Sequence, residues 1–298
     1  MKYLFVFGGT MTFTALGLIV TAAFIHATWN LLAKQASGGP AFVWLYSLAA
    51  FILYAPVIVV LVFLDPPEYG LGGWIFIGAS GILHLCYSVA LQRGYQVADL
   101  SVVYPLARGT GPLISSLGAM LLFGERPTLC GVIGIGLIVL GILLVSGGSG
   151  ALLSRDSHGL NGIAFGMLTG LFIASYTLND AYAVKYLLVS PILLDYFGNS
   201  VRLAFLTPAV LLSPHRLRKE SRLNLRLGLA VGALVPLSYI LALFAMRLSP
   251  VSYVAPAREL SMLVGSFLGA RVLDEGNIGQ RLIGAALMVV GIVALAVG

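Results

Sequence analysis

Ten long apolar stretches constrain this chain more than any other feature of its sequence. Each is close to the ~20 residues that an α-helix needs to cross a bilayer, and none alternates polar and apolar residues as membrane β-strands do. Hydrophobic residues make up 59% of the 298 and charged residues only 9%. The sequence therefore predicts an all-α membrane protein with ten transmembrane helices. They span about 12–34, 41–64, 72–93, 99–123, 128–147, 160–184, 191–212, 225–247, 251–273 and 279–297.

Composition and missing motifs exclude several classes of function. A soluble domain carries about a quarter charged residues, which excludes a soluble enzyme, a nucleic-acid binder and a disordered scaffold. The chain contains no H-E-x-x-H, G-x-S-x-G or G-x-x-x-x-G-K-[ST] motif, the usual marks of a metalloprotease, a serine hydrolase and a nucleotide-binding loop. Its two cysteines, Cys86 and Cys130, lie far apart inside apolar stretches. We expect no enzyme activity, no metal and no cofactor.

An internal repeat predicts the architecture. Residues 101–108 (SVVYPLAR) resemble residues 252–258 (SYVAPAR), and each segment is followed by a serine, a Leu-Gly-Ala run and a glutamate, Glu125 or Glu275. We expect both glutamates to have a structural role at a helix end. Five spans in each half is an odd number, so the two halves must enter the membrane in opposite senses. Such inverted repeats are typical of secondary transporters, with the substrate site near the midplane.

We expect a first five-helix repeat over residues 1–147, a linker over 148–159 and a second five-helix repeat over 160–298. The fourth predicted span ends in Phe-Gly-Glu-Arg (123–126), and the ninth in a degraded copy, Leu-Asp-Glu-Gly (273–276). The first span carries a Trp-Asn-x-x-x-Lys pattern at 29–34. With the helix count and the repeat, these motifs resemble the EamA type of the drug/metabolite transporter superfamily over essentially the whole chain. The resemblance implies a ten-helix fold and secondary transport of small metabolites, often export of amino acids or related compounds.

Polar side chains inside the apolar spans indicate the expected substrate pathway, because such groups are costly at membrane depth. His26, Trp29 and Asn30 share one face of the first span by their i, i+3, i+4 spacing. His84 and Tyr87 share one face of the third span, and Tyr239 occupies the repeat position that corresponds to Tyr87. Interhelical hydrogen bonding that merely ties the bundle together is the alternative interpretation.

Two arginines matched by the repeat are the strongest candidates for substrate binding. Arg108 and Arg258 each lie about eight residues into a helix, on the order of 10–12 Å deep, and two or three residues after a proline. We expect at least one to face a central cavity and bind a carboxylate or similar anion. Glu259 would then hold the amino group of a zwitterionic substrate. The alternative is that both arginines form ion pairs that stabilise the bundle.

Titratable groups in the spans suggest how transport is driven. Glu259, Asp180 and His26 are the candidates for coupling to protons. The alternative is that Glu259 is a structural partner for an arginine and that transport is uncoupled. Asp195 and Arg202, seven residues apart on one helix face, are expected to form structural ion pairs with neighbouring helices.

These observations predict a secondary transporter that exports a small polar, anionic or zwitterionic, amino-acid-like metabolite across the bacterial inner membrane by alternating access. A multidrug or lipophilic-compound exporter and a non-transport membrane scaffold or sensor remain as alternatives. The expected partners are a small-molecule substrate, the lipid bilayer and protons. Glycines on the fifth and tenth spans fit packing within the chain or a dimer contact, so we expect a monomer or a weak homodimer.

The orientation of the chain is contested. Lysines and arginines in the loops and at the ends of the predicted spans number four on the side of the termini and ten on the other. The positive-inside rule then places both termini outside the cytoplasm, whereas many relatives in the superfamily have cytoplasmic termini. The basic run from Arg216 to Arg226 is hard to translocate and favours the charge count.

Overall fold

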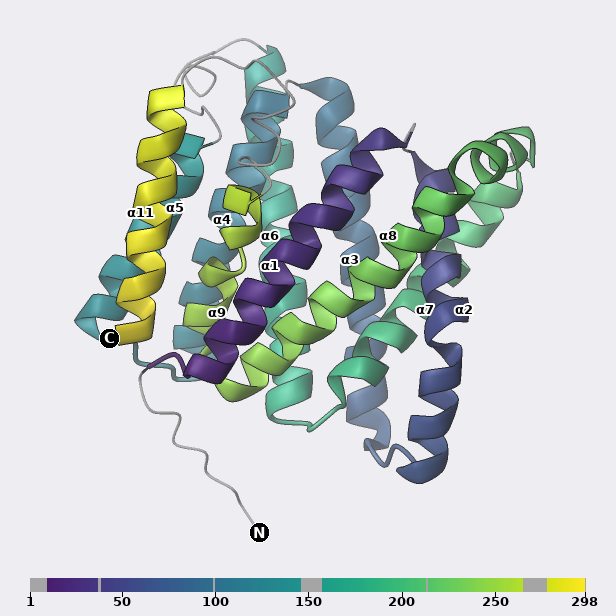
Figure 1. Cartoon of the computed structure of the whole chain (residues 1–298), viewed down its shortest axis with the longest axis horizontal. Coiled ribbons are helices and arrows are strands. Elements are labelled where there is room, and N and C mark those ends of the chain that lie inside the picture. The colour runs from purple at the N-terminus through teal and green to yellow at the C-terminus, as the bar shows by residue number, and fades with distance from the viewer. Residues whose placement is uncertain are drawn as a thin grey trace.

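The computed structural model describes residues 10–36, 39–98, 100–145, 157–212, 214–264 and 278–297. Every regular element in these ranges is an α-helix (Figure 1). Most of the predicted linker, at 148–156, and Glu275 lie outside the described residues.

Helices occupy each range in which the sequence predicts a span. In the first half these are α1 (Phe13–Gln35), α2 (Pro40–Leu64), α3 (Gly70–Val97), α4 (Leu100–Leu122) and α5 (Leu129–Val145). The second half contains α6 (Ser157–Lys185), α7 (Pro191–Leu211), α8 (Pro214–Leu248), α9 (Val251–Ala257) and α11 (Ile278–Val297). Among the described residues, five helices are long and apolar enough to cross a membrane, namely Phe13–Gln35, Pro40–Leu64, Gly70–Val97, Leu160–Lys185 and Glu220–Leu248.

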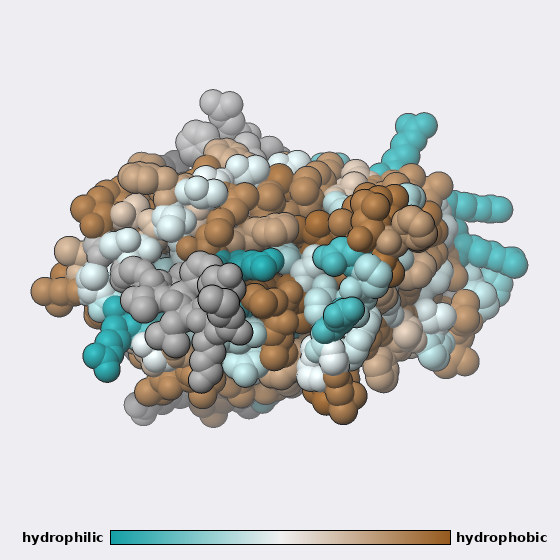
Figure 2. Space-filling view, turned by 90° about the horizontal axis from the view of Figure 1, so that it is seen from below, coloured by the Kyte–Doolittle hydropathy of each residue, from teal (hydrophilic) through white to brown (hydrophobic). Residues whose placement is uncertain are grey.

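The surface of the bundle suits contact with lipid. Large apolar side chains such as Phe13, Phe63 and Leu121 are more than four-fifths exposed, and Figure 2 shows hydrophobic residues over much of the visible face. Burying such groups in an apolar medium is favourable, whereas exposing this many to water is not. The apolar outer surface is therefore that of a membrane protein.

The helices pack so that elements from the two halves alternate. α1 lies along α8 and α3 lies along α6, while α5 packs against α11 (Figure 1). α2 contacts both α7 and α8, and α4 contacts α6 and α9. The first half is thus not a separate body, and any cavity between these helices is built by both halves.

The ninth helix is interrupted at its two charged residues. α9 ends at Ala257, a turn holds Arg258 and Glu259, and helix resumes at Leu260. Pro256, which has no N–H to donate, precedes this turn, and its carbonyl accepts the Glu259 N–H at 3.0 Å. At the matching place in the first half, α4 runs unbroken past Arg108. A broken helix exposes backbone and side chains to a cavity, as discontinuous helices of transporters do.

The start of α8 corrects the prediction of a break between His215 and Arg226. This segment is helical from Pro214, and the helix kinks at Asn224, whose φ of −121° is not helical. Arginine, lysine and glutamate form helices well, and Asn224 Nδ2 donates to Glu220 Oε1 at 2.7 Å one turn away. The prediction was wrong because it looked for apolar runs, and this helical segment is polar.

Candidate functional site

A cavity of about 400 Å³ lies between the helices of the two halves. Residues of α1, α2, α3, α4, α6, α7 and α8 line it, together with those at the break after α9. All nine residues that the sequence indicated as substrate-binding line this one cavity, namely His26, Trp29, Asn30, His84, Tyr87, Arg108, Tyr239, Arg258 and Glu259. Segments up to about 230 residues apart in the chain therefore contribute to a single site.

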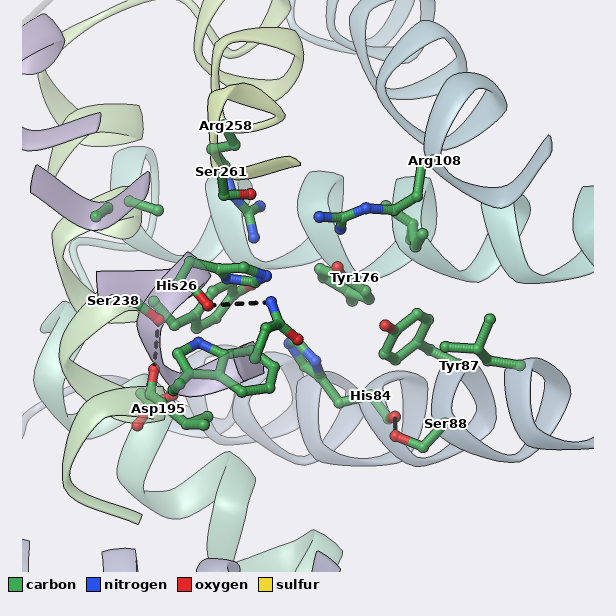
Figure 3. Close-up of a pocket in the computed structure, with 18 of the residues that line it drawn as sticks. His26, His84, Tyr87, Ser88, Arg108, Tyr176, Asp195, Ser238, Arg258 and Ser261 are labelled. Carbon is green, nitrogen blue, oxygen red and sulfur yellow. Dashed lines mark hydrogen bonds between the residues drawn. The ribbon is translucent and has the colours of Figure 1, made fainter. Parts of the chain in front are cut away.

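The two arginines enter the cavity from different helices and have different partners. The side chains of Arg108 and Arg258 converge on the same part of the cavity (Figure 3). Arg108 Nε lies 3.0 Å from Glu259 Oε2, an ion pair whose atoms are not aligned as a hydrogen bond. Arg258 instead lies over the ring of Tyr239, with its Cζ 5.1 Å from the ring centroid. Within the described ranges no carboxylate lies at ion-pair distance from Arg258.

Because only Arg108 has a carboxylate partner in the described part of the chain, the two arginines differ in their ability to bind a further anion. Glu259 compensates much of the Arg108 charge, while Arg258 retains its charge against an aromatic face, an attraction worth roughly 0.5–2 kcal/mol. Among the described charged residues lining the cavity are Arg108, Arg202 and Arg258 against Asp195 and Glu259, which sum formally to 3 − 2 = +1. The cavity is thus suited to an anionic group.

One wall of the cavity is formed by the predicted polar face of α1. The rings of His26 and Trp29 meet edge to face, 4.7 Å between centroids, and Asn30 Nδ2 donates to the His26 carbonyl at 3.0 Å. The buried indole N–H of Trp29 has no hydrogen-bond partner in the described part of the chain. An unpaired buried donor costs free energy, so a ligand acceptor at this position would be bound favourably.

Aromatic rings form the opposite wall. His84 stacks on Tyr176 at 4.0 Å and meets Tyr239 edge-on at 5.1 Å. Tyr87 packs against Tyr176 at 5.8 Å. These rings offer flat apolar surfaces beside the charged groups, so the cavity is amphipathic.

A carboxylate lies directly behind this aromatic wall. Asp180 is fully buried, and its Oδ2 accepts the Tyr239 hydroxyl at 2.5 Å and lies 3.3 Å from His84 Nε2. Its Oδ1 accepts from Asn179 Nδ2 at 2.9 Å. Of the three proton-coupling candidates, Glu259 and His26 line the cavity and Asp180 adjoins it through Tyr239 and His84.

Asp195 and Arg202 do not form the structural ion pairs that the sequence predicted. Arg202 Nη2 donates to Asn199 Oδ1 at 2.7 Å on its own helix, and its Cζ lies 5.8 Å from the ring of Tyr46. In the described part of the chain no cation lies at ion-pair distance from Asp195. The prediction of ion pairs with neighbouring helices was wrong because both residues line the cavity instead.

A polar cluster joins the halves at the end of the molecule where α1 begins. Glu125, after α4, accepts the backbone N–H groups of Val251 and Ser252 at 2.7 and 2.8 Å, which caps α9. Lys185, at the end of α6, lies 3.5 Å from Glu125 Oε1 and donates to the Ser249 carbonyl at 2.7 Å. These contacts close this end of the bundle with hydrogen bonds.

Several cavity residues were not predicted as site residues. They include Tyr46, Tyr95, Tyr104, Tyr176, Ser238 and Ser261. Tyr176 had a signal, because the repeat places it on the sixth span near the position of the first-span polar face. No sequence signal singled out the others, including Tyr95 on α3, and only the packing of the helices shows that they face inward.

Comparison with known proteins finds similarity to one family model and to a solved structure. Residues 13–147 match the model of the EamA-like transporter family. A solved crystal structure superposes with a TM-score of 0.72 at 16% sequence identity, over 94% of this chain and 97% of the other; at this identity the likeness shows the fold alone. No curated protein matches the chain.

Proposed function

We propose that this chain, whose residues 13–147 match the model of the EamA-like transporter family, is a secondary transporter that exports a small anionic or zwitterionic metabolite across the bacterial inner membrane. The observation that carries the proposal is the cavity between the halves, where Arg258 lies without a carboxylate partner among the described residues. A guanidinium fork suits a carboxylate, which it binds through two parallel hydrogen bonds.

The same cavity defines the rest of the proposed substrate. Its volume of about 400 Å³ lies at the lower end of the range of small-molecule sites. The rings of Tyr176 and His84 offer stacking surfaces, and the Trp29 indole offers a donor. With Glu259 held by Arg108, the role of Glu259 toward a substrate amino group is weaker than the sequence suggested.

We also propose that the two halves form an inverted repeat. The contact of α1 with α8 has its counterpart in the contact of α3 with α6, as a two-fold axis in the membrane plane requires. Where α5 contacts α11, Gly134 faces Gly291 and Gly141 faces Gly284. The repeat offset of 150 residues matches Gly134 to Gly284 and Gly141 to Gly291, so each pair maps onto the other. Because helices of the two halves alternate in the bundle, the simplest alternating-access motion is a rocking about the cavity of helix groups that each contain members of both halves.

A lipophilic-compound exporter is the second candidate, and the aromatic wall is the observation that favours it. Thermal unfolding of the purified protein with carboxylates, and separately with their neutral amides, distinguishes the two. We expect the carboxylates to raise the Tm and the amides to have little effect. Equal shifts would favour the second candidate.

Two charge-preserving variants test the anion site itself. We expect Arg258→Lys to weaken binding of the stabilising carboxylate by about tenfold or more, because the fork is lost. Arg108→Lys should weaken binding less, because the Arg108 guanidinium is already paired with Glu259. Arg247→Lys, at an exposed arginine, is the control. Unchanged affinity in both cavity variants would overturn the proposed site.

A further inference from the structure

Asp180 is the most fully enclosed acid beside the cavity. It is 0% exposed, yet His84 and Tyr239, which contact its Oδ2, both line the cavity. The amide of Asn179 is held between Asp180 Oδ1 and the Phe76 carbonyl. One side chain therefore separates this carboxyl group from any ligand in the cavity.

The protonation of this cluster is tied to its burial. A carboxylate removed from water costs several kcal/mol unless a cation compensates it. In the described part of the chain, the ionisable cation at ion-pair distance from Asp180 is His84, at 3.3 Å, and histidine is charged only after it takes up a proton. A proton held between His84 Nε2 and Asp180 Oδ2, which lie 3.3 Å apart, would compensate this buried charge, so the pair is suited to hold one exchangeable proton.

Tyr239 joins this pair to the anion site. Its hydroxyl donates to Asp180 Oδ2 at 2.5 Å, and its ring lies under Arg258 at 5.1 Å. An anion that draws the guanidinium away changes the surroundings of the same tyrosine that hydrogen-bonds the acid. His84 makes a second link through its stacking on Tyr176.

Several charged and titratable groups lie on the helices around α6, and each must be compared with Asp180 as a site for the proton. They are His84 and Tyr87 on α3, Arg108 on α4, Tyr176 on α6 itself, Asp195 and Arg202 on α7, Tyr239 on α8, and Arg258 and Glu259 after α9. Glu259 already has a cation partner, Arg108, whose Nε lies 3.0 Å from its carboxylate. His26 contacts Trp29, with no carboxylate at ion-pair distance among the described residues. The Asp195 carboxyl group has no hydrogen-bond partner in the described part of the chain, so it lacks a link to the anion site such as Tyr239 gives to Asp180.

We propose that the Asp180–His84 pair is the binding site for a coupling proton, and that Tyr239 links it to the anion site at Arg258. The proposal rests on the proposed transport function and names the ion that drives it. During a cycle the pair takes a proton from one side of the membrane and releases it to the other. No covalent bond to the substrate is made or broken.

Proton binding is tested without any substrate. Infrared pH-difference spectra of the full-length protein in liposomes report carboxyl groups that gain a proton. We expect a carboxylic-acid band in the wild type that is lost in Asp180→Asn and shifted in its midpoint pH in His84→Gln and Tyr239→Phe. Asp65→Asn, at an exposed acid, is the matched control and should leave the band unchanged. Persistence of the band in Asp180→Asn, or its loss in Glu259→Gln or Asp195→Asn instead, would overturn the assignment.

Coupling is tested in proteoliposomes that contain a pH-sensitive dye, with a mixture of radiolabelled amino acids as the probe. We expect movement of label to be accompanied by proton movement in the wild type. In Asp180→Asn the proton movement should fall to the level of protein-free liposomes, while exchange of label for label continues. If label moves in the wild type without proton movement, the inference of proton coupling is overturned and the proposed transport function stands. Absence of any label movement counts against the proposed function, and the infrared result then decides the proton site by itself.

Discussion

At the scale of single residues, Glu125 joins the two halves of the chain through hydrogen bonds. The sequence placed Glu125 at the end of the fourth span, and the structure shows it capping α9 from the other half of the chain through two backbone N–H groups. A carboxylate at a helix N-terminus compensates unpaired donors and the helix dipole. Which helix it caps depends on tertiary packing, which no local pattern encodes.

We predict that Glu125→Gln lowers the free energy of unfolding by about 1–3 kcal/mol, because the amide loses the negative charge and has only one oxygen to accept the two backbone N–H groups. Thermal unfolding in detergent measures the change. Glu68→Gln, at an exposed glutamate, is the control and should unfold like the wild type. An unchanged Tm for Glu125→Gln would show that the cap contributes little.

The cavity residues divide by how far the sequence could predict them. His26, Trp29 and Asn30 were predictable because polar groups at helical spacing in an apolar run have few other uses. The pairing of Arg108 with Glu259 was not, since it depends on the approach of α4 to the break after α9. Sequence repeats matched Arg108 to Arg258, but the unequal partners of the two arginines come from packing.

At the scale of elements, glycines bring α5 and α11 into close contact. A Cβ added to Gly141 would lie 2.6 Å from the Gly284 carbonyl oxygen, and one added to Gly134 would lie 2.8 Å from that of Gly291. Such distances require the helices to move apart. The glycines of these spans thus serve packing within the chain, one of the two interpretations that the sequence left open.

We predict that Gly141→Ala destabilises the protein by about 1–3 kcal/mol through overpacking. Gly136→Ala is a matched control on the same helix, because nothing lies within 4 Å of the added Cβ. Alanine favours helix by about 1 kcal/mol over glycine, so this control should be neutral or slightly stabilising. Thermal unfolding of both variants compares them directly, and equal Tm values would contradict the predicted close contact.

The helices themselves were largely predictable, and their interruptions less so. Apolar runs located most helices to within a few residues; the exceptions are the polar start of α8 and the ninth span, predicted over 251–273, where α9 ends at Ala257. The break at Arg258 followed from Pro256, but the equivalent proline in the first half leaves α4 continuous. A proline permits a break, and the surrounding contacts decide whether it occurs.

At the scale of the whole molecule, the two ends of the described chain meet. Met11 N lies 3.4 Å from the Leu295 carbonyl oxygen, so both termini belong to the same end of the bundle. α8 begins near the opposite end, where α1 finishes (Figure 1). The basic segment at the start of α8 and the termini thus lie at opposite ends.

We predict from the positive-inside rule that the termini face the periplasm. A phosphatase fused after Gly298 should be active, and a fluorescent protein fused there should be dark. A fusion in the loop after α7 should give the reverse result. Fluorescence at Gly298 would place the termini in the cytoplasm and show that the charge count misleads for this chain.

The polar cluster of Glu125, Lys185 and Ser249 has a consequence for motion. In the proposed cycle, this end of the bundle must come apart when the cavity opens toward it. A seal made of apolar side chains would expose hydrophobic surface at that moment, whereas water can replace each hydrogen bond of a polar seal at small net cost. The two conformations of the proposed cycle would therefore differ little in free energy. A transporter that must return to its starting conformation in every cycle requires such a small difference.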